Sequence, residues 1–264
     1  MIIQGTKLTG TIVNDGLVTG GLLLYLDSRN PRSWPGSGST WYDLSGLGNN
    51  ATFYSNPSKL NNGSTEQNGN VINGNTLGNN GLGDLYFNGT SSSGLYQFAW
   101  GPNLGTSLSR YTIMCWVNFA SLVSTSEAPA VFNLGDYTGY SGGTTVNGTI
   151  AFFNGTSNDG NLHAGFYNSG WNATSGYTVS TGNWYHTVMT YDSATIKFYI
   201  NNSLLYSTSV SSTISNSLGY RVGRRWDGWD TVDAYIPISM VYNRALSASE
   251  ISQNFNYHRG RYGV

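Results

Sequence analysis

One strong helix signal near the C-terminus, in a chain that otherwise carries strand and turn signals, most constrains how this protein can fold. Ser247 is placed as a helix N-cap, and Glu250, three residues later, completes a capping box. Leu246 before the cap and Ile251 after Glu250 have the spacing of a hydrophobic staple, so both sides of the first turn are specified. The sequence therefore predicts one short helix at the end of an otherwise β chain.

Strand signals recur at short intervals along the chain. Runs rich in β-branched and aromatic residues alternate with Asn-Gly and Gly-Gly turns, which is typical of an antiparallel sandwich without crossover helices. The Asn-, Gly- and Ser-rich segment 55–83 instead predicts a long surface loop, anchored by apolar residues such as Val71, Leu77 and Leu82. We expect strands at 21–27, 83–87, 111–119, 130–134, 148–153, 162–167, 184–191, 195–200, 204–208, 220–223 and 234–242.

Composition narrows the class of protein. Charged residues make up only 9% of the chain, aromatic residues 14%, and the formal net charge is −1, so disorder through high charge is excluded. Basic residues are scattered, apart from Arg221, Arg224 and Arg225 and a terminal pair, Arg259 and Arg261, so the basic stripe needed for nucleic acid is missing. We expect a single soluble domain without a signal peptide or membrane span.

Several spaced motifs resemble those of concanavalin A-like jelly-roll domains of the laminin G and pentraxin-like kind. The closing motif of many such domains, Tyr-Asn-Arg-Ala-Leu-Ser-x-x-Glu-Ile, stands at 242–251. Further matches are the opening run at 21–27, the Pro- and Gly-rich segment with Trp and Asp at 35–46, the Phe-Asn-Gly turn within 85–90, the strand at 111–117 and the Trp-x-His strand at 184–188. The resemblance implies an all-β, two-sheet antiparallel jelly-roll sandwich with a short C-terminal helix over residues 21–264.

The N-terminal segment lies outside these motifs. Residues 1–20 alternate weakly between apolar and polar side chains, as around Thr9, Thr11 and Val13. We expect either an edge strand of the sandwich or an extended arm that reaches a neighbouring subunit.

A resemblance to tailed-phage structural proteins in particular lies in the opening motifs at 21–27 and 35–46 and in the final residues 254–263. This implies a non-enzymatic structural or adhesion protein of the virion, as a capsid decoration, tail or fibre component. Such a protein would be made in the host cytoplasm, would lie on the virion surface, and would assemble as an oligomer with other virion proteins. Residues 1–20, Arg259 and Arg261 would then be candidate docking elements. The alternative is a lectin that recognises host-surface glycans, and the two roles can coexist.

Glycan hydrolysis is disfavoured by the acidic residues. The superfamily that these motifs resemble contains retaining glycosidases, which need two carboxylates about 5 Å apart. This chain has the glutamates Glu66, Glu127 and Glu250, and none lies in a Glu-x-Asp-x-Glu strand. The chain has three histidines, His163, His186 and His258. None of them has a neighbouring acid or nucleophile in a recognisable catalytic arrangement. We therefore expect no enzyme activity.

Aromatic residues in loops are the candidates for ligand binding. Rings flanked by amides and carboxylates suit stacking on sugars, and they equally suit protein interfaces or packing over the open end of the sandwich. The candidates are Tyr137, Tyr140, Trp171, Trp226, Asp227, Trp229 and Asp230. Asp227, Asp230 and Asp233 could also hold a calcium ion, the one cofactor considered. The alternative for these aspartates is a solvated turn that caps backbone amides or pairs with Arg224 and Arg225.

Overall fold

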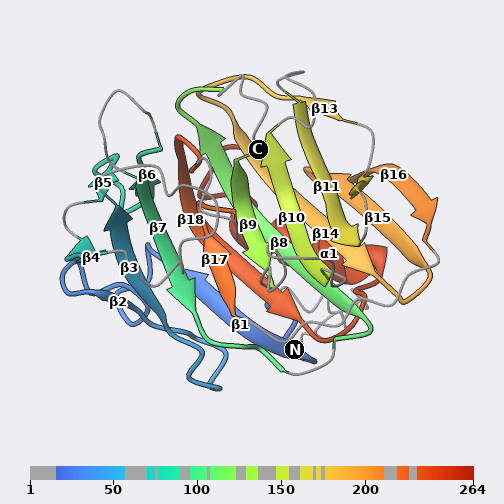
Figure 1. The fold of residues 1–264 in the computed structure, drawn as a ribbon, viewed down its shortest axis with the longest axis horizontal. Helices are drawn as coiled ribbons and strands as arrows, with labels where there is room; N and C mark the ends of the chain where they lie inside the picture. The colour runs from blue at the N-terminus through green and yellow to red at the C-terminus, as the bar shows by residue number, and fades with distance from the viewer. Residues whose placement is uncertain are drawn as a thin grey trace, which may run out of the picture.

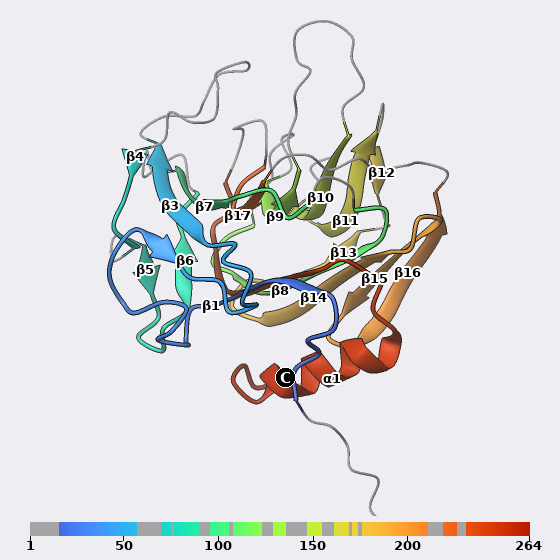
Figure 2. The same ribbon diagram turned by 90° about the horizontal axis from the view of Figure 1, so that it is seen from below.

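Two β-sheets stack face to face, and a helix lies outside one of them (Figures 1 and 2). All strand pairs found among the described residues are antiparallel, as the sequence predicts. The computed structural model describes residues 16–56, 70–74, 77–89, 96–105, 108–122, 129–135, 147–154, 161–168, 171–173, 176–210, 219–225 and 231–264. The expected two-sheet sandwich with a short C-terminal helix is confirmed.

The first sheet has eight strands, in the order β16-β15-β14-β8-β18-β6-β5, with β1 also paired to β18. Their bounds are β1 Leu22–Asp27, β5 Gly78–Asn79, β6 Leu85–Phe87, β8 Tyr111–Phe119, β14 Trp184–Tyr191, β15 Thr195–Ile200, β16 Ser203–Ser209 and β18 Ala234–Tyr242. The register Leu26↔Ser239 places the first described strand against the last one, so the two ends of the domain meet inside this sheet.

The second sheet has ten strands, in the order β12-β11-β10-β9-β17-β7-β3-β2, with β13 added to β11 and β4 to β3. Their bounds are β2 Thr40–Trp41, β3 Ala51–Asn56, β4 Asn70–Val71, β7 Tyr96–Gly101, β9 Ala130–Leu134, β10 Asn147–Asn154, β11 Asn161–Asn168, β12 Trp171–Ala173, β13 Tyr177–Thr178 and β17 Tyr220–Val222. Figure 1 shows this sheet in front of the eight-stranded one.

Every strand that the sequence predicts is present within a few residues of its expected bounds. The expectation of a continuous loop over 55–83 is wrong in part, since β4 and β5 lie within it. Leu77 is buried, as expected of an anchor. Val71 and Leu82, expected as anchors, are exposed instead. A strand of two residues is too short to show the alternation of apolar and polar side chains. Both strands contain Asn, and β5 also contains Gly, residues that favour loops, so the local sequence pattern does not predict them.

The eight-stranded sheet has an apolar core on each face. Along β8, the buried side chains of Ile113, Cys115 and Val117 join the core between the sheets, whereas Met114 and Trp116 join a second core on the other face. This is the period-two alternation of a strand that is covered on both sides. Such burial explains why this stretch is an almost uninterrupted apolar run.

Helix α1 (Ala248–Arg259) covers that second core (Figure 2). The capping box is confirmed: Ser247 Oγ accepts from the Glu250 amide at 3.3 Å, and the Ser247 amide donates to Glu250 Oε2 at 2.9 Å. Arg244 adds a two-pronged ion pair to Glu250, and this bond holds the pKa of Glu250 at about 2. Leu246 and Ile251 are both buried in the second core, as a hydrophobic staple requires. Helix α1, which the structure describes in full, is not long and apolar enough to cross a membrane.

Residues 16–20 lie along α1 and do not form a strand. The Val18 amide donates to Asn254 Oδ1 at 2.9 Å, and the Tyr242 hydroxyl donates to the Val18 carbonyl at 2.9 Å. Gln253 donates to the Gly16 carbonyl. These five residues are therefore anchored to the folded domain, while the choice between arm and edge strand for residues 1–15 lies outside the described residues.

Candidate functional site

Most of the predicted ligand-binding residues lie outside the described residues. These are Tyr137, Tyr140, Trp226, Asp227, Trp229 and Asp230. Trp171 lies in β12 at one end of the ten-stranded sheet, where its backbone pairs with Tyr167 of β11. Asp233, the third predicted calcium ligand, is described.

The structure describes the residues on either side of the predicted loop 226–230. Arg224 and Thr231 form an antiparallel bridge, and the Val232 amide donates to the Gly223 carbonyl at 3.0 Å. The two ends of the loop therefore leave the domain side by side, immediately after β17 of the ten-stranded sheet. Arg224 places its guanidinium 4.6 Å from the centre of the Phe98 ring.

A cluster of rings lies next to this base, on the outer side of the ten-stranded sheet. Phe53 of β3 and Ala99 of β7 belong to the core between the sheets, so their neighbours Tyr54, Phe98 and Trp100 point the other way. Tyr54 stacks on Phe98 with ring centres 5.4 Å apart and lies 5.9 Å from Trp100. Tyr54, Phe98 and Trp100, together with Arg221 and Arg224 of the β17 segment, are called the outer aromatic face below.

The two arginines of this face lie over its rings. Arg221 holds its guanidinium 5.6 Å from the centre of Trp100 and, like Arg224, is only 2% exposed. Tyr54 and Trp100 are partly exposed, whereas Phe98 is buried. A guanidinium over a ring face is attracted by the ring quadrupole, more strongly where water is excluded. The arginines therefore hold the rings in position and add positive charge beside them.

Asn133 adds an unused acceptor to the same region. It is paired with Arg221 in the β9–β17 register, and its Nδ2 donates to the Gly135 carbonyl at 2.7 Å. Its Oδ1 is buried and has no hydrogen-bond partner among the residues that the structure describes. A buried acceptor without a donor is destabilising, so a ligand hydroxyl or amide that reached it would gain a hydrogen bond at low desolvation cost.

The outer aromatic face was not predicted from the sequence, where the candidate binding residues were aromatic residues in loops. Its rings come from β3 and β7, which were not among the expected strands. The alternation Phe98, Ala99, Trp100 was the available signal, because it places two large rings on one face of a strand.

Asp233 is already bound within the protein. Its carboxylate accepts from the Tyr86 hydroxyl and from Ser121 Oγ, the latter at 2.6 Å. Burial, followed by the hydrogen bond to Asp233, raises the pKa of Tyr86. Within the described ranges, no group of three or more His, Cys, Asp or Glu side chains is placed to hold a metal. The calcium hypothesis for Asp227 and Asp230 stays a prediction.

The other acidic and imidazole side chains in the described ranges have structural positions. Asp27, Asp43, Asp84, Asp192, Asp233 and Glu250 all accept hydrogen bonds from the protein itself. His186 of β14 and His258 of α1 are buried between the helix and the eight-stranded sheet, beside Phe255 and Tyr25 respectively. His163 lies in β11 of the other sheet.

A family model described as the concanavalin A-like lectin/glucanases superfamily matches residues 91–252. This chain belongs to that superfamily. The match spans more than half of the chain and includes strands of both sheets as well as the start of α1. The laminin G-like, lectin-like fold expected from the spaced motifs is therefore confirmed, while the tailed-phage setting stays a prediction.

Solved structures with the same fold include a domain in complex with a sugar, a sialidase and the binding domain of a toxin. Domain 4 of AbnA, an extracellular arabinanase from Geobacillus stearothermophilus in complex with arabinotriose, has a TM-score of 0.59 and 18% identity, over 88% of this concanavalin A-like chain and 97% of that one. Trypanosoma rangeli sialidase in complex with the inhibitor DANA has a TM-score of 0.59 and 17% identity, over 90% of this chain and 33% of the sialidase. The botulinum neurotoxin serotype C1 binding domain has a TM-score of 0.52 and 13% identity, over 89% of this chain and 52% of the neurotoxin chain. No curated protein sequence matches this chain.

At these identities the structural similarities show the fold alone. This concanavalin A-like chain spans a third of the sialidase and about half of the neurotoxin chain, but almost all of the arabinanase domain.

Proposed function

We propose that this concanavalin A-like domain is a non-catalytic glycan-binding module and that the outer aromatic face holds the sugar. The supporting observation is the partly exposed pair Tyr54 and Trp100, fixed by Arg221 and followed by the free acceptor of Asn133. Aromatic rings offer flat apolar area at small entropic cost, and a few fixed polar groups beside them give orientation. This combination suits a sugar ring, which has apolar C–H faces and polar edges.

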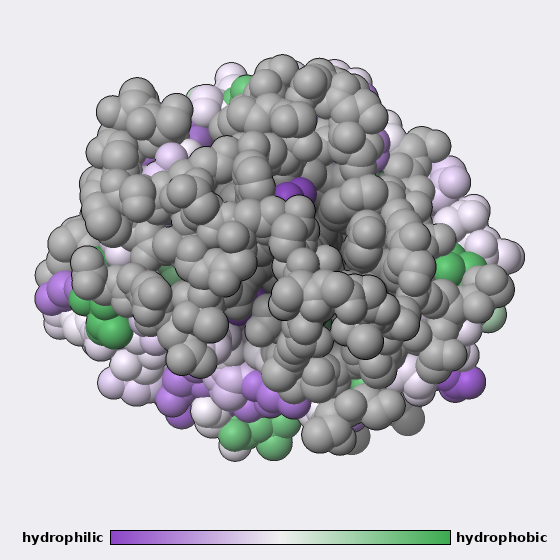
Figure 3. Space-filling view, viewed as in Figure 1, coloured by the Kyte–Doolittle hydropathy of each residue, from purple (hydrophilic) through white to green (hydrophobic). Residues whose placement is uncertain are grey.

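The two sheets differ in what their outer faces offer. The outer face of the eight-stranded sheet is apolar around Met114 and Trp116 and is covered by α1. The outer face of the ten-stranded sheet has Arg221, Asn133 and aromatic rings, and no described helix lies against it (Figure 2). Figure 3 views the molecule from this side and shows hydrophilic residues among the described atoms at its rim. A polar ligand therefore fits the ten-stranded side.

The proposal of a non-catalytic role follows from how the described carboxylates are used. Retaining glycosidases place two carboxylates about 5 Å apart around the sugar, one as nucleophile and one as acid. Glu250, the one described glutamate, is bound to Arg244 and Ser247 outside the other sheet. The arabinanase domain in complex with arabinotriose supports the idea that this fold can present a sugar-binding surface.

Trp100→Ala should weaken retention of the protein on an immobilised bacterial polysaccharide or on an oligosaccharide array by about tenfold, because it removes one stacking ring. Tyr257→Ala is the matched control, since Tyr257 is an aromatic residue on α1 that is 45% exposed. Dissociation constants are measured by calorimetry on the glycans that the array identifies. Equal binding by Trp100→Ala and wild type, with both folded, would contradict the site.

The same glycans test the non-catalytic role. No reducing sugar should be released from them by the wild-type protein over hours. Turnover that disappears when a single aspartate is replaced would show that the proposal of a non-catalytic role is wrong.

We also propose that the module works on the surface of a tailed-phage virion, as an oligomeric structural or adhesion protein in contact with other virion proteins. This setting rests on the opening motifs at 21–27 and 35–46 and on the final residues 254–263, which resemble those of such proteins. It predicts synthesis in the host cytoplasm and a host-surface glycan as the ligand.

Removing residues 1–15 should leave a folded protein with an unchanged melting temperature that is no longer incorporated into particles. The cut leaves Gly16 and Val18 in place, so the contacts to Gln253 and Asn254 are kept. Incorporation is measured by mass spectrometry of purified particles. The comparison is a cut before Gly21, which also removes the Val18 contacts and should lower the melting temperature. Normal incorporation of the first truncation would rule out a docking arm.

A further inference from the structure

A separate cavity of about 530 Å³ is lined by residues from 17–32, which include β1, and from 42–50, after β2. Leu22 and Leu44, both partly buried, lie in its wall, and Tyr42 adds an aromatic ring that is 45% exposed. The volume is within the range of small-molecule sites in proteins. No residue of the outer aromatic face lines this cavity, so it is a distinct place for a ligand.

The acid that lines this cavity is already bound by the protein. Asp43 Oδ1 accepts from the Tyr25 and Ser45 amides, both at 2.9 Å. Its Oδ2 accepts from Ser45 Oγ at 2.6 Å and from the Asn49 amide at 3.0 Å. A carboxylate has about four acceptor sites, two on each oxygen, and here each oxygen has two donors. Asp43 therefore has no acceptor site left for a ligand.

Two amide side chains that line the cavity have donors to offer. Asn30 Oδ1 accepts from the Arg32 backbone amide at 3.0 Å, and Asn50 Oδ1 accepts from the Asp43 backbone amide at 2.9 Å. Because a backbone N–H can only donate, these bonds fix which end of each side chain is the oxygen. Within the part of the chain that the structure describes, neither Nδ2 has a hydrogen-bond partner. Both Nδ2 groups are therefore available to an acceptor on a ligand.

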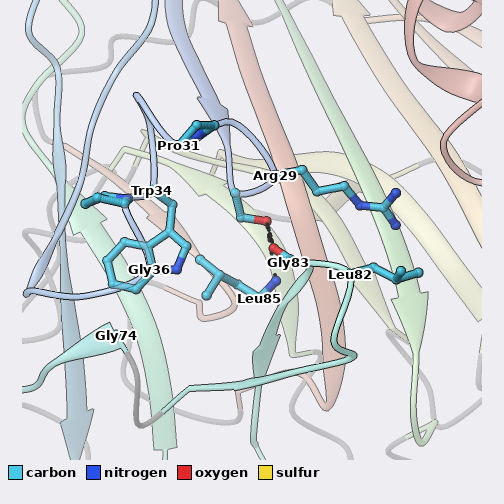
Figure 4. Close-up of a pocket in the computed structure, with 10 residues that line it drawn as sticks. Arg29, Pro31, Trp34, Gly36, Gly74, Leu82, Gly83 and Leu85 are labelled. Atoms are coloured by element: carbon cyan, nitrogen blue, oxygen red, sulfur yellow. Dashed lines mark hydrogen bonds between the residues drawn. The ribbon is translucent and has the colours of Figure 1, made fainter.

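Arg32 adds a cation to these donors. Its guanidinium forms no ion pair or hydrogen bond with a described residue. The cavity of about 400 Å³ shown in Figure 4 is also lined by an arginine, but there Arg29 is bound to Asp84 through two bonds of 2.6 Å. A guanidinium matches a carboxylate through two parallel hydrogen bonds. Of these two cavities, the one beside β1 is therefore the one whose arginine can bind the carboxylate of a ligand.

We propose that the cavity beside β1 binds a uronic acid unit of an acidic glycan. The sugar carboxylate pairs with Arg32, the sugar ring packs on Tyr42, and oxygens of the sugar accept from Asn30 and Asn50. A neutral sugar lacks the group that pairs with Arg32, and a small anion such as acetate lacks the ring, so both bind less well. The inference rests on the proposed glycan-binding role and adds a second site with its own specificity.

The test is a ¹⁵N NMR titration of the side-chain amides of Asn30 and Asn50 with methyl glucuronide, methyl glucoside and acetate, each added separately. Asn30→Asp and Asn50→Asp identify the two signals and keep the oxygen that accepts from the backbone. Methyl glucuronide should shift both signals in a saturable way, with a dissociation constant on the order of millimolar. Methyl glucoside and acetate should each bind about tenfold more weakly or not at all.

Two pairs of variants test the assigned contacts. Arg32→Gln should weaken the binding of methyl glucuronide by about tenfold. Its control is Arg110→Gln, because Arg110 is also exposed but lies outside the cavity, and it should leave the affinity unchanged. Tyr42→Ala should also weaken binding, whereas Tyr257→Ala, at a ring that is likewise 45% exposed but on α1, should not.

Three results would overturn the inference: unmoved amide signals at high methyl glucuronide, equal affinity for methyl glucoside or acetate, and wild-type affinity in Arg32→Gln. Trp100→Ala should keep the response to methyl glucuronide, because Trp100 does not line the cavity. If glycan binding depends on Trp100 but methyl glucuronide moves neither signal, the inference about the cavity fails alone. If methyl glucuronide moves both signals but no glycan depends on Trp100, the proposal for the outer aromatic face fails alone.

Discussion

Replacing Asp84 with alanine should lower the free energy of unfolding by about 3–5 kcal/mol, because it leaves a partly buried guanidinium without its counter-charge. The Asp84 side chain is fully buried, the Arg29 side chain is 18% exposed, and two bonds of 2.6 Å join them. The hydrogen bond to Asp84 raises the pKa of Arg29 in the wild-type protein. Without Asp84 the guanidinium still keeps its proton, because arginine is effectively always protonated in proteins, so Arg29 cannot avoid the loss by becoming neutral. Urea unfolding at about pH 7 measures the change.

Two further variants show whether the unpaired charge is the cause. Asp192→Ala removes a turn carboxylate that accepts from the Ala194 and Thr195 amides, and should cost about 1 kcal/mol. Arg29→Met combined with Asp84→Leu removes both charges and should recover much of the stability, as replaced buried ion pairs often do. A midpoint for Asp84→Ala equal to that of Asp192→Ala would show that the pair contributes little.

Acid should destabilise the protein through two buried histidines, His186 beneath α1 and His258 within it. Burial lowers the pKa of His186 to about 3 and that of His258 to about 4, from 6.5 in the unfolded chain. His258 Nδ1 lies 3.0 Å from the Asn254 carbonyl, which can only accept, so Nδ1 carries the proton. His258 Nε2 lies 3.0 Å from the Tyr25 hydroxyl, which also donates to Asp27 Oδ2 at 3.1 Å. Arg261 nearby also lowers the pKa of His258, whereas Asp27 raises it.

The direction of the pH effect follows from these pKa values. Below pH 6.5 the unfolded chain binds protons that the folded protein does not, so the stabilisation present above pH 6.5 is lost as the pH falls toward 4. At about 1.4 kcal/mol per pKa unit, each histidine removes roughly 3 kcal/mol over that window. Glu250, with a pKa of about 2 in the fold, adds its own loss only below its ordinary pKa of 4.5.

Urea unfolding at several pH values between about pH 7 and pH 4 measures this loss of stability. In the upper part of that range only the histidines contribute, because Glu250 begins to contribute below its ordinary pKa of 4.5. His186→Gln and His258→Gln should each flatten the dependence, because glutamine does not titrate. A wild-type free energy of unfolding that is the same at both ends of the range would contradict the prediction.

Local signals in the sequence were sufficient for the helix and for most strands. The capping box of Ser247 and Glu250 lies within three residues, and the apolar, β-branched and aromatic run at 111–119 is visible without any partner strand. These features depend on neighbouring residues and on the period of the backbone, so they can be predicted before the fold is known. The spaced motifs extended this to the fold class, which the family match confirms.

The sites depend on contacts that local pattern does not contain. Arg221 meets Trp100 only because β17 pairs with β7, far earlier in the chain, and Arg29 meets Asp84 only because β6 packs near the loop after β1. Asp27 is bound by Arg261, which lies 234 residues away. The pairing of distant strands depends on how the whole core is buried and not on any one segment. The sequence alone therefore determined only which residues could share one face of a strand or helix. Tertiary structure decided which of them became neighbours.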